Sequence, residues 1–597
     1  MDRNTIIAIV LSVIVITVGM TIQTVFFAPE LPVSEEIAEE AVNNTDTVLP
    51  DNTVGGITAV GVEPDITPFE VKAGEYSITF DPAGASVSSI KLNNHSDNGQ
   101  PVELLFRDDE AVNAFMMYSG KGLSDPIDEG FYYTESRHST LPLTIVTFTR
   151  DFISDDTGEE FTIEKRFAIP DNGEYMIQLA VSFRDKNGNS IIPINDNGTM
   201  YTLSVGPQIG PAFESMSNNY DYRRVSVRYD EKNRSDARFS DGVFTSDSDE
   251  KVDWISLSGK YFTFMLIPDD SITVASAGAM QYTNDTGVPQ EDIIYIERAA
   301  AASSDSSDMY SFYAGPKVKS NLSIYENGES VFSVDGEDLT SIIDGSWLTW
   351  LENILNWILQ LFYKVIPNYG VAIILLTILI KLLLQPLAKK GMDSTAKMGA
   401  LTPKINEIKE RYPDDPEAQN AAMAKLYKEE KINPMGSCIP MLIQFPIFIA
   451  LYGLLNTNFD LRGSMFIPGW IPDLSIPDTI YTLPFAIPFL GTQIHLLPIL
   501  YTISMIFSMK ITQSGSQASA QQGMMAFMTY GMPIIFFFIM YNAPSGLLLY
   551  WSTVNVISIG QQMFVNKKKK AVYAEEIAEK DAIKQAKKEA KRKNRRK

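Results

Sequence analysis

The sequence predicts a polytopic α-helical membrane protein with six spans, five of which form a C-terminal core, joined to a large β-sandwich domain. Apolar segments of membrane-spanning length occur near the N-terminus and repeatedly after residue 370. Between them, apolar and polar residues alternate with the period of two that is typical of strands. The two parts differ in charge. Residues 28–346 are strongly acidic, with 21 Lys and Arg against 55 Asp and Glu. This asymmetry indicates a chain divided by a membrane.

Residues 1–28 are predicted to form an uncleaved membrane anchor. The apolar run from Thr5 to Phe27 follows one basic residue, Arg3, and is long enough to cross about 30 Å of hydrocarbon. No cleavage pattern of small residues follows it, which favours an anchor over a signal peptide. Residues 29–68 are rich in Glu, Asp, Asn and Pro, and we expect a disordered acidic linker there.

Residues 69–335 are predicted to form the β-sandwich. Tyr76, Ile78 and Phe80 alternate with polar residues, and the run EEFTIEKRFAIPDNGEYMIQLAVSF reads as two strands around the turn PDNG. Carboxylates are frequent, but a solvated acidic surface explains them better than a catalytic pair does.

Residues 345–363 are predicted to form an amphipathic helix in the membrane interface. Trp347, Trp350 and Trp357 recur at helical spacing, and tryptophan-rich helices often lie along membrane surfaces. The alternative is a core helix of the β domain. The apolar run that follows closely favours the interface.

Residues 367–566 are predicted to contain five spans. The first includes Lys381, and the other four are Met435 to Asn456, Ile494 to Ile511, Met524 to Tyr541 and Ser545 to Val565. Basic residues in short loops mark the cytoplasmic side. Residues 389–433 contain nine, residues 458–493 contain one, and 14 follow Asn566. We therefore expect both termini in the cytoplasm and the acidic domain outside.

Residues 390–433 are predicted to form a projecting helical hairpin, because two helical patterns flank the break PDDPE. The nine basic and eight acidic residues of residues 389–433 nearly cancel, which suits a protein partner or a lipid headgroup more than nucleic acid. Residues 567–597 form a basic tail, which suits ribosomal RNA or anionic lipid or acts only as a positive-inside anchor. Nothing indicates DNA as a partner.

A lysine inside an apolar run is the strongest functional signal. Lys381 lies in VAIILLTILIKLLLQPL, where a charge costs roughly 2.5 to 3.5 kcal/mol and usually serves function. Helical spacing places Thr377 and Gln385 on the same face.

Two other segments carry polar stripes, Gln444, Tyr452 and Asn456 in one and Trp551, Asn555, Ser558 and Gln562 in the other. Stripes that face one another would outline a wet cavity. In the alternative, Lys381 extends to the cytoplasmic interface and the other polar groups only bond adjacent helices.

Other chemistries are not indicated. The chain has one cysteine, Cys438, and three scattered histidines, so no metal-ligand spacing occurs. No glycine-rich phosphate loop is found where a strand would lead into a helix. We expect no cofactor, no metal and no enzymatic activity.

Three runs resemble those of YidC-type bacterial membrane protein insertases. They are INPMGSCIPMLIQFPIFIALYGLL, NAPSGLLLYWSTVNVISIGQQ and STAKMGALTPKINEIKERY, and the segment KYF at Lys260 to Phe262 also matches. Because the chain also has a predicted anchor and a large β domain, it resembles the long form of this family. In that form the β domain is periplasmic and the spans lie in the inner membrane. That domain is related in shape to sugar-binding folds.

The resemblance implies a hydrophilic groove, closed on the outer side, that receives the polar flank of a substrate helix. In the family the charged residue of the groove is usually arginine, and Lys381 occupies the matching position. Lysine keeps the positive charge but cannot form the bidentate hydrogen bonds that arginine makes to a carboxylate. Gln444, Tyr550, Trp551 and Asn555 match groove and substrate-contact positions.

The implied function is insertion and folding of nascent membrane proteins, alone or with the Sec translocon. The ribosome and the signal recognition machinery are further expected partners. One alternative is a secondary transporter or channel with Lys381 as an anion site, but internal symmetry is lacking. Another is a membrane-bound enzyme that acts on carbohydrate, for which no catalytic set is evident.

Overall fold

The computed structural model describes residues 56–594, apart from several internal gaps. These are residues 98, 107–111, 156, 212–221, 231–233, 241, 247–250, 284–288, 301–306, 335, 344–346, 414, 431–438, 489 and 514–525. The predicted anchor and most of the predicted linker lie outside the described residues.

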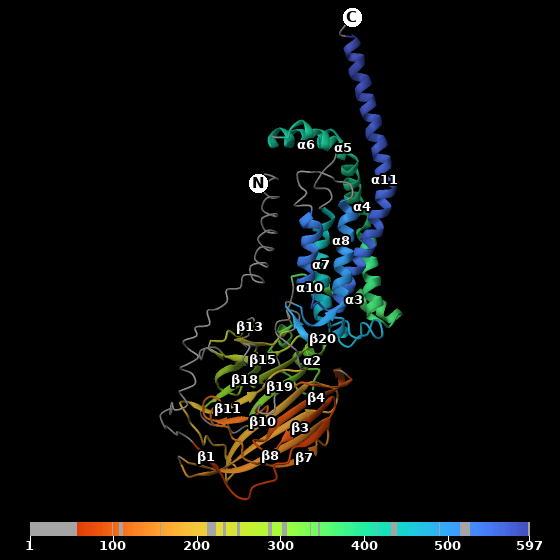
Figure 1. Cartoon of the computed structure of the whole chain (residues 1–597). Helices are drawn as coiled ribbons and strands as arrows, with labels where there is room; N and C mark the ends of the chain where they lie inside the picture. Colours follow the sequence, from red (N-terminus) through yellow and green to blue (C-terminus); the bar gives the residue numbers. More distant parts are fainter. Residues whose placement is uncertain are drawn as a thin grey trace. The chain divides into compact units, whose positions relative to one another are not determined.

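Three antiparallel sheets form the first half of the described chain (Figure 1). The largest has the order β1-β8-β9-β10-β19-β16-β15-β12-β13, with β7 beside β8; the others have the orders β14-β17-β18-β11-β6 and β2-β3-β4-β5. The strands are β1 (Ile57–Ala59), β2 (Phe69–Ala73), β3 (Tyr76–Asp81), β4 (Ser86–Asp97), β5 (Gln100–Glu103), β6 (Met117–Ser119), β7 (Tyr132–Arg137), β8 (Leu143–Ser154), β9 (Glu160–Pro170), β10 (Met176–Asp185), β11 (Thr199–Val205), β12 (Arg224–Tyr229), β13 (Ser235–Asp236), β14 (Val243–Thr245), β15 (Val252–Ser258), β16 (Phe262–Pro268), β17 (Val274–Thr283), β18 (Pro289–Ala299) and β19 (Asp308–Pro316).

Side chains from all three sheets meet in one hydrophobic core, as a packed β domain requires. Strand β9 buries alternate residues, which is the pattern that the sequence predicts. Strands β15 and β16 are instead buried along their whole length. The reason is a second cluster, in which Trp254 and Met265 pack on the other face with residues of α2 (Lys319–Glu326) and η1 (Leu339–Ile342).

The β domain begins earlier than the predicted boundary at residue 69. Strand β1 pairs with β8, and the carbonyl oxygen of Val62 accepts hydrogen bonds from Arg150 Nη1 at 2.7 Å and from the Tyr132 hydroxyl at 2.8 Å. The prediction of disorder up to residue 68 is therefore wrong for this stretch. Its three-residue strand is too short for a periodic signal, and Arg150 lies 88 positions away in sequence.

Helix α3 (Thr349–Val365) belongs to the helical half of the chain. Leu355 and Leu359 lie in the core cluster of the helices and not in those of the β domain, so the alternative of a β-domain core helix is wrong. Trp347, Trp350 and Trp357 expose 75, 61 and 67 % of their surface. Their position in a membrane interface stays a prediction.

The helical half comprises α4 (Tyr369–Ala400), α5 (Thr402–Arg411), α6 (Pro416–Glu429), α7 (Ile439–Thr457), η3 (Phe459–Leu461), α8 (Leu496–Gln513), η5 (Phe527–Gly531), α10 (Met532–Met540) and α11 (Ser545–Asn594). Within the described residues, the segment Tyr369–Pro386 is long and apolar enough to cross a membrane; Gln444–Thr457, Leu496–Ile511 and Thr529–Met540 are shorter apolar helices. The expectation of six spans thus goes beyond the described helices.

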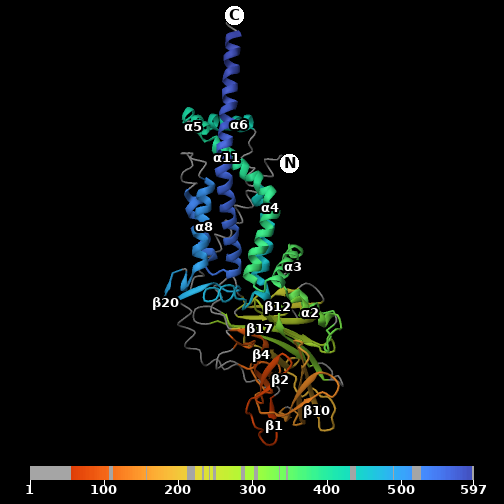
Figure 2. The same ribbon diagram turned by 90° about the vertical axis from the view of Figure 1, so that its right-hand side faces the viewer.

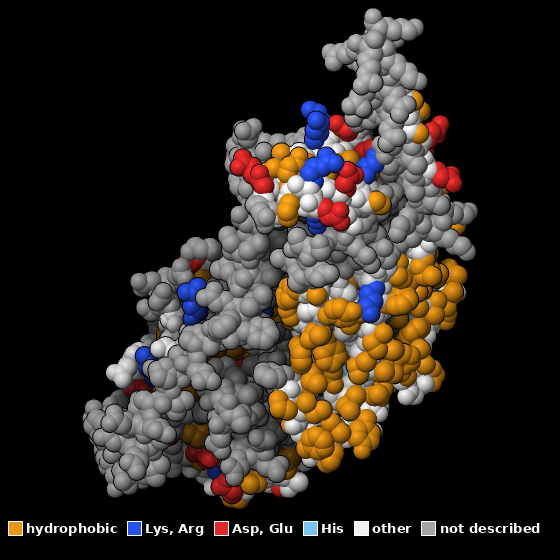
Figure 3. Space-filling view, turned by 45° about the horizontal axis from the view of Figure 1, so that its top comes forward, with side chains coloured by type: hydrophobic (Ala, Val, Ile, Leu, Met, Phe, Trp, Pro, Cys, Tyr) orange, Lys and Arg blue, Asp and Glu red, His pale blue; other side chains and the backbone are white. Residues whose placement is uncertain are grey.

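Hydrophobic side chains cover much of the helical surface on the face in Figure 3. Ile503, Phe507 and Val556 are among the exposed ones. Soluble monomers rarely expose contiguous apolar surface of this extent, so a lipid environment explains it.

Helix α5 ends at Arg411 and α6 begins at Pro416, within the predicted break PDDPE. The Asp415 carboxylate accepts a hydrogen bond from Ala418 N and caps α6. Lys404, near the start of α5, forms an ion pair with Glu430, after the end of α6, at 3.1 Å. This pairing indicates that the two helices run antiparallel.

Two elements depart from the sequence-based expectation. A two-stranded hairpin, β20 (Thr479–Ile487) and β21 (Gly491–His495), occupies a segment that was expected to be mostly loop. Helix α11 continues to Asn594, well beyond the expected end at Val565. Ala, Glu and Lys are strong helix formers, which explains why the basic tail extends the helix.

Candidate functional site

Lys381 lies on α4 and contacts α11. Its Nζ donates a hydrogen bond to Ser558 Oγ at 3.0 Å, and Ser558 Oγ donates to the carbonyl oxygen of Val554 at 2.8 Å. Lys381 is half-buried. In the described part of the chain, no carboxylate forms an ion pair with it, and its hydrogen-bond partner is a neutral hydroxyl. An ammonium group has three donors, so this contact leaves two available.

Thr377 and Gln385, predicted on the same face, do not join this contact. Thr377 is buried, and its Oγ1 donates to the carbonyl oxygen of Ile373 at 2.7 Å, one turn earlier in the helix. Gln385 is exposed. Of the three residues, Lys381 is the one that forms a hydrogen bond to α11 in the described part of the chain.

Tyr550 and Trp551 are buried in the core of the helices. The Tyr550 hydroxyl lies near the side chain of Gln444, which lies on α7. The Trp551 ring stacks on Phe448 at 5.3 Å between centroids and lies 6.0 Å from the ring of Tyr501. Its Nε1 is buried, and no described residue accepts a hydrogen bond from it.

Asn555 connects α11 to a third helix, because its Nδ2 donates to Ser504 Oγ of α8 at 3.3 Å. Trp551, Asn555 and Ser558 share one face of α11, but they contact α7, α8 and α4, respectively. Helix α11 therefore joins three neighbours through its polar stripe.

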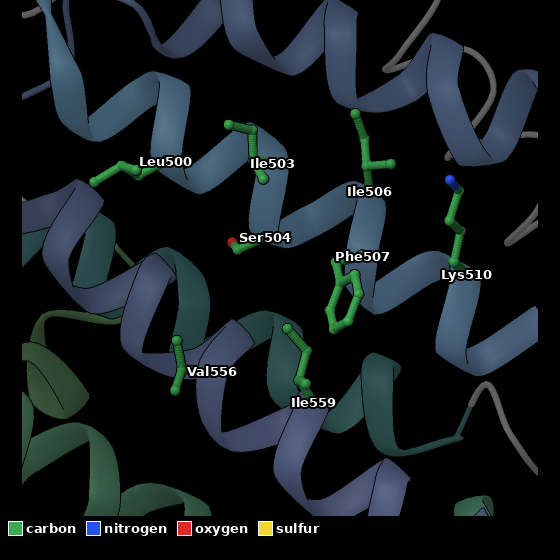
Figure 4. Close-up of a pocket in the computed structure, with 8 residues that line it drawn as sticks. All are labelled: Leu500, Ile503, Ser504, Ile506, Phe507, Lys510, Val556 and Ile559. Atoms are coloured by element: carbon green, nitrogen blue, oxygen red, sulfur yellow. The ribbon is translucent and has the colours of Figure 1, made fainter.

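A hollow of about 480 Å³ lies between α8 and α11 (Figure 4). Its lining is apolar except for Ser504 and Lys510, and its members are Leu500, Ile503, Ser504, Ile506, Phe507, Lys510, Val556 and Ile559. None of the predicted groove residues lines it. Ser504 connects the hollow to the predicted groove residues, because it also accepts the hydrogen bond from Asn555.

The loop before α8 is held by one buried carboxylate. Asp478 Oδ2 accepts hydrogen bonds from Leu497 N at 2.7 Å, Leu496 N at 3.1 Å and Trp470 Nε1 at 2.9 Å. Ser545 N and Gly546 N, at the start of α11, donate to carbonyl oxygens of the same loop at 2.8 Å. The loop therefore satisfies backbone donors at the starts of two helices.

Sequence reasoning did not select Ser504, Ser558 or Asp478 as site residues. Ser558 was visible as a member of the stripe on α11, three residues after Asn555. Asp478 gave no capping signal, because it lies 18 positions before the first residue of the helix that it caps.

Comparisons with known proteins agree over both halves of the chain. Residues 361–572 match the family model of the 60Kd inner membrane protein, and residues 69–358 match that of the YidC periplasmic domain. The membrane protein insertase YidC of Treponema denticola is 34 % identical over 96 % of this chain and 100 % of its own length. That of Treponema pallidum is 32 % identical over 95 % of this chain and 99 % of its own length.

A crystal structure of an active YidC insertase with the first transmembrane domain resolved covers 88 % of this chain and 99 % of its own, with 17 % identity and a TM-score of 0.34. The sequence comparisons decide the assignment, since a relative above 30 % identity matches along nearly the full length. The chain belongs to the YidC family of membrane protein insertases, inner-membrane proteins with a periplasmic domain.

Proposed function

We propose that this chain inserts nascent membrane proteins by giving the polar flank of a substrate helix a charged and hydrated place inside the helical bundle, without covalent chemistry. The observation that carries the proposal is the half-buried ammonium of Lys381, which has a neutral hydroxyl as its partner. Polar groups cross bare hydrocarbon at high cost, and a cation partway lowers that cost for an acidic flank. Membrane potential assists at about 2.3 kcal/mol per charge per 100 mV.

The groove of this proposal is built around α11. Gln444, Tyr550, Trp551 and Asn555 contribute polar or aromatic groups beside Lys381, and Thr377 and Gln385 extend its face along α4. The Nε1–H of Trp551, which has no acceptor among the described residues, is available to a substrate carbonyl or carboxylate. Support comes from the contacts of α11 with α4, α7 and α8.

The proposed topology has six spans, namely the anchor 1–28, α4, α7, α8, α10 with η5, and the first part of α11. Both termini are cytoplasmic and the β domain is periplasmic, as the basic residues of residues 389–433 and the tail indicate. In this arrangement α3 lies in the outer interface. The α5–α6 hairpin and the basic end of α11 face the ribosome, the signal recognition machinery or anionic lipid, and the Sec translocon acts alongside for some substrates.

Complementation of a depleted strain tests the proposal. The readout is insertion of a small single-span protein with an acidic outer tail, scored by protease protection. We expect Lys381→Met to fail, Lys381→Arg to rescue, and Lys510→Met, which removes another lysine of the helical half, to behave as the parent chain does.

Each other result has a defined meaning. Normal insertion without the protein would overturn the function. Normal insertion with Lys381→Met would remove the charge from the mechanism. Loss of solute uptake while insertion proceeds would instead favour the transporter or channel.

A further inference from the structure

The β20–β21 hairpin exposes large apolar side chains. Ile480, Tyr481 and Phe485 expose 47, 60 and 61 % of their surface, and almost every residue of β20 is exposed. Figure 2 shows β20 below the lower end of the helices, next to the start of α8. An isolated two-stranded hairpin is marginally stable in water and needs a surface to pack on.

The hairpin lacks the charged residues that usually protect an exposed strand in water. No Asp, Glu, Lys or Arg occurs in residues 479–509, which include the hairpin and most of α8. Exposed strand edges in soluble proteins are usually protected by charged side chains, lysine above all. This hairpin has aromatic and aliphatic residues in their place.

The base of the hairpin is rigidly attached to α8. Residue 478 caps the helix, β21 ends at His495, and α8 begins at the next residue. The Tyr541 hydroxyl donates a hydrogen bond to the carbonyl oxygen of Gln493 at 2.9 Å, and the rings of Tyr541 and His495 lie 4.8 Å apart. The exposed apolar residues of the hairpin are therefore followed directly along the chain by α8, which exposes Ile503 and Phe507.

We propose that the β20–β21 hairpin binds lipid, with Ile480, Tyr481 and Phe485 inserted between the headgroups and the upper acyl chains of the outer leaflet. We infer lipid as the binding partner because the hairpin leads directly into α8, whose exposed apolar residues would face lipid. The backbone limits how deeply the hairpin inserts. Its unpaired edge N–H and C=O groups find hydrogen-bond partners among headgroups and water but none in hydrocarbon. The tyrosine ring, apolar with a polar tip, suits the same level.

The test uses the full-length chain in single-copy lipid nanodiscs, with Cys438→Ser as the background. An environment-sensitive fluorophore is attached at Phe485→Cys, and at Val62→Cys, an exposed residue of the β domain, as the matched control. We expect lipid carrying a nitroxide near the headgroup to quench the label at position 485 several-fold more than the label at position 62. Aqueous iodide should show the reverse order. Tyr481→Cys serves if Phe485→Cys does not fold.

Three results would overturn the proposal. In the first, iodide quenches both labels equally and the lipid nitroxide quenches neither. In the second, protection from iodide arises only with two copies per nanodisc, which indicates a second copy as the occupant. In the third, protection arises only after a substrate chain is added. Substrate insertion is measured on the same samples, so failure here is distinguishable from failure of the proposed function.

Discussion

Lys381 Nζ lies 3.0 Å from Ser558 Oγ, and this contact joins two helices across 177 positions of the sequence. A hydroxyl orients the ammonium group but does not neutralise it. The charge of Lys381 therefore stays available to an acidic segment.

Replacing the hydroxyl tests whether the unneutralised charge matters. Ser558→Ala removes one hydrogen bond and keeps the charge, so we expect a small loss of insertion. Ser558→Asp places a carboxylate beside the ammonium, and we expect insertion of an acidic-tailed substrate to slow by roughly tenfold, equivalent to about 1.4 kcal/mol. The measurement is the initial rate of protease protection in depleted cells.

Ser504→Asp is the matched control, because Ser504 also bonds α11 but does so through Asn555. If this variant slowed insertion as much as Ser558→Asp, a carboxylate anywhere among these helices would be disruptive and the pairing with Lys381 would not be the cause.

Substitution of Trp551 distinguishes a role of its indole N–H in stability from a role in substrate binding. Trp551→Phe keeps the stack on Phe448 and removes a buried N–H that has no acceptor among the described residues. Since an unpaired buried donor costs about 1–3 kcal/mol, we expect unchanged or higher thermal stability. If the N–H binds substrate, insertion should fall nevertheless.

Thermal unfolding and insertion are therefore measured on the same Trp551→Phe protein. A fall in both would show that the indole N–H supports the fold and would contradict its assignment to substrate.

Asp478 is expected to hold the start of α8. Asp478→Asn replaces a charged acceptor of three N–H groups by an amide, and hydrogen bonds to charged groups contribute about 1.5–3 kcal/mol each. We expect faster hydrogen exchange at Leu496 and Leu497. Asp473→Asn is the control, because that carboxylate accepts a local bond from Ser475 N; equal exchange in both variants would contradict the role of Asp478.

Lys165 makes the stability of the β domain depend on pH. It is fully buried and donates to the carbonyl oxygens of Ala85 and Phe115 at 2.6 Å and of Gly84 at 3.0 Å. Burial lowers the pKa of Lys165 from 10.5 to about 7. Between these pH values the unfolded chain binds more protons than the folded one, so the free energy of unfolding should rise with pH, by at most about 1.4 kcal/mol per unit.

Hydrogen exchange of β9 amides in the full chain, corrected for the intrinsic rate at each pH, measures this slope. Lys165→Met should abolish it and also lower stability, because three buried carbonyl groups lose their donor. Lys186→Met, at an exposed ion pair with Glu160, should leave the slope unchanged. A slope that persists in Lys165→Met would assign it to another group.

Periodicity and charge predicted the main divisions of the chain, because both arise from burial along single elements. The alternation in β9 and the apolar run around Lys381 were readable for this reason. Strand β1 and the β20–β21 hairpin were not, since short strands are specified by partners that local sequence does not identify.

The polar residues of the helices could be selected from the sequence, but their contacts could not. Helical spacing put Thr377 beside Lys381, yet the structure turns the threonine back on its own helix and gives the lysine Ser558. Spacing defines a face of one helix, and only packing determines which neighbouring helix each residue of that face meets. For the same reason, the hollow beside Ser504 could not be foreseen.

Disulfide cross-linking to a stalled substrate tests the central claim most directly. A cysteine at Ser558, in the Cys438→Ser background, is paired with a cysteine in the outer tail of a ribosome-bound single-span chain. We predict efficient cross-linking to an acidic tail, and a marked loss when the tail carboxylates become amides or Lys381 becomes methionine. Equal cross-linking of acidic and neutral tails, unaffected by Lys381→Met, would contradict the claim that the lysine charge receives the substrate.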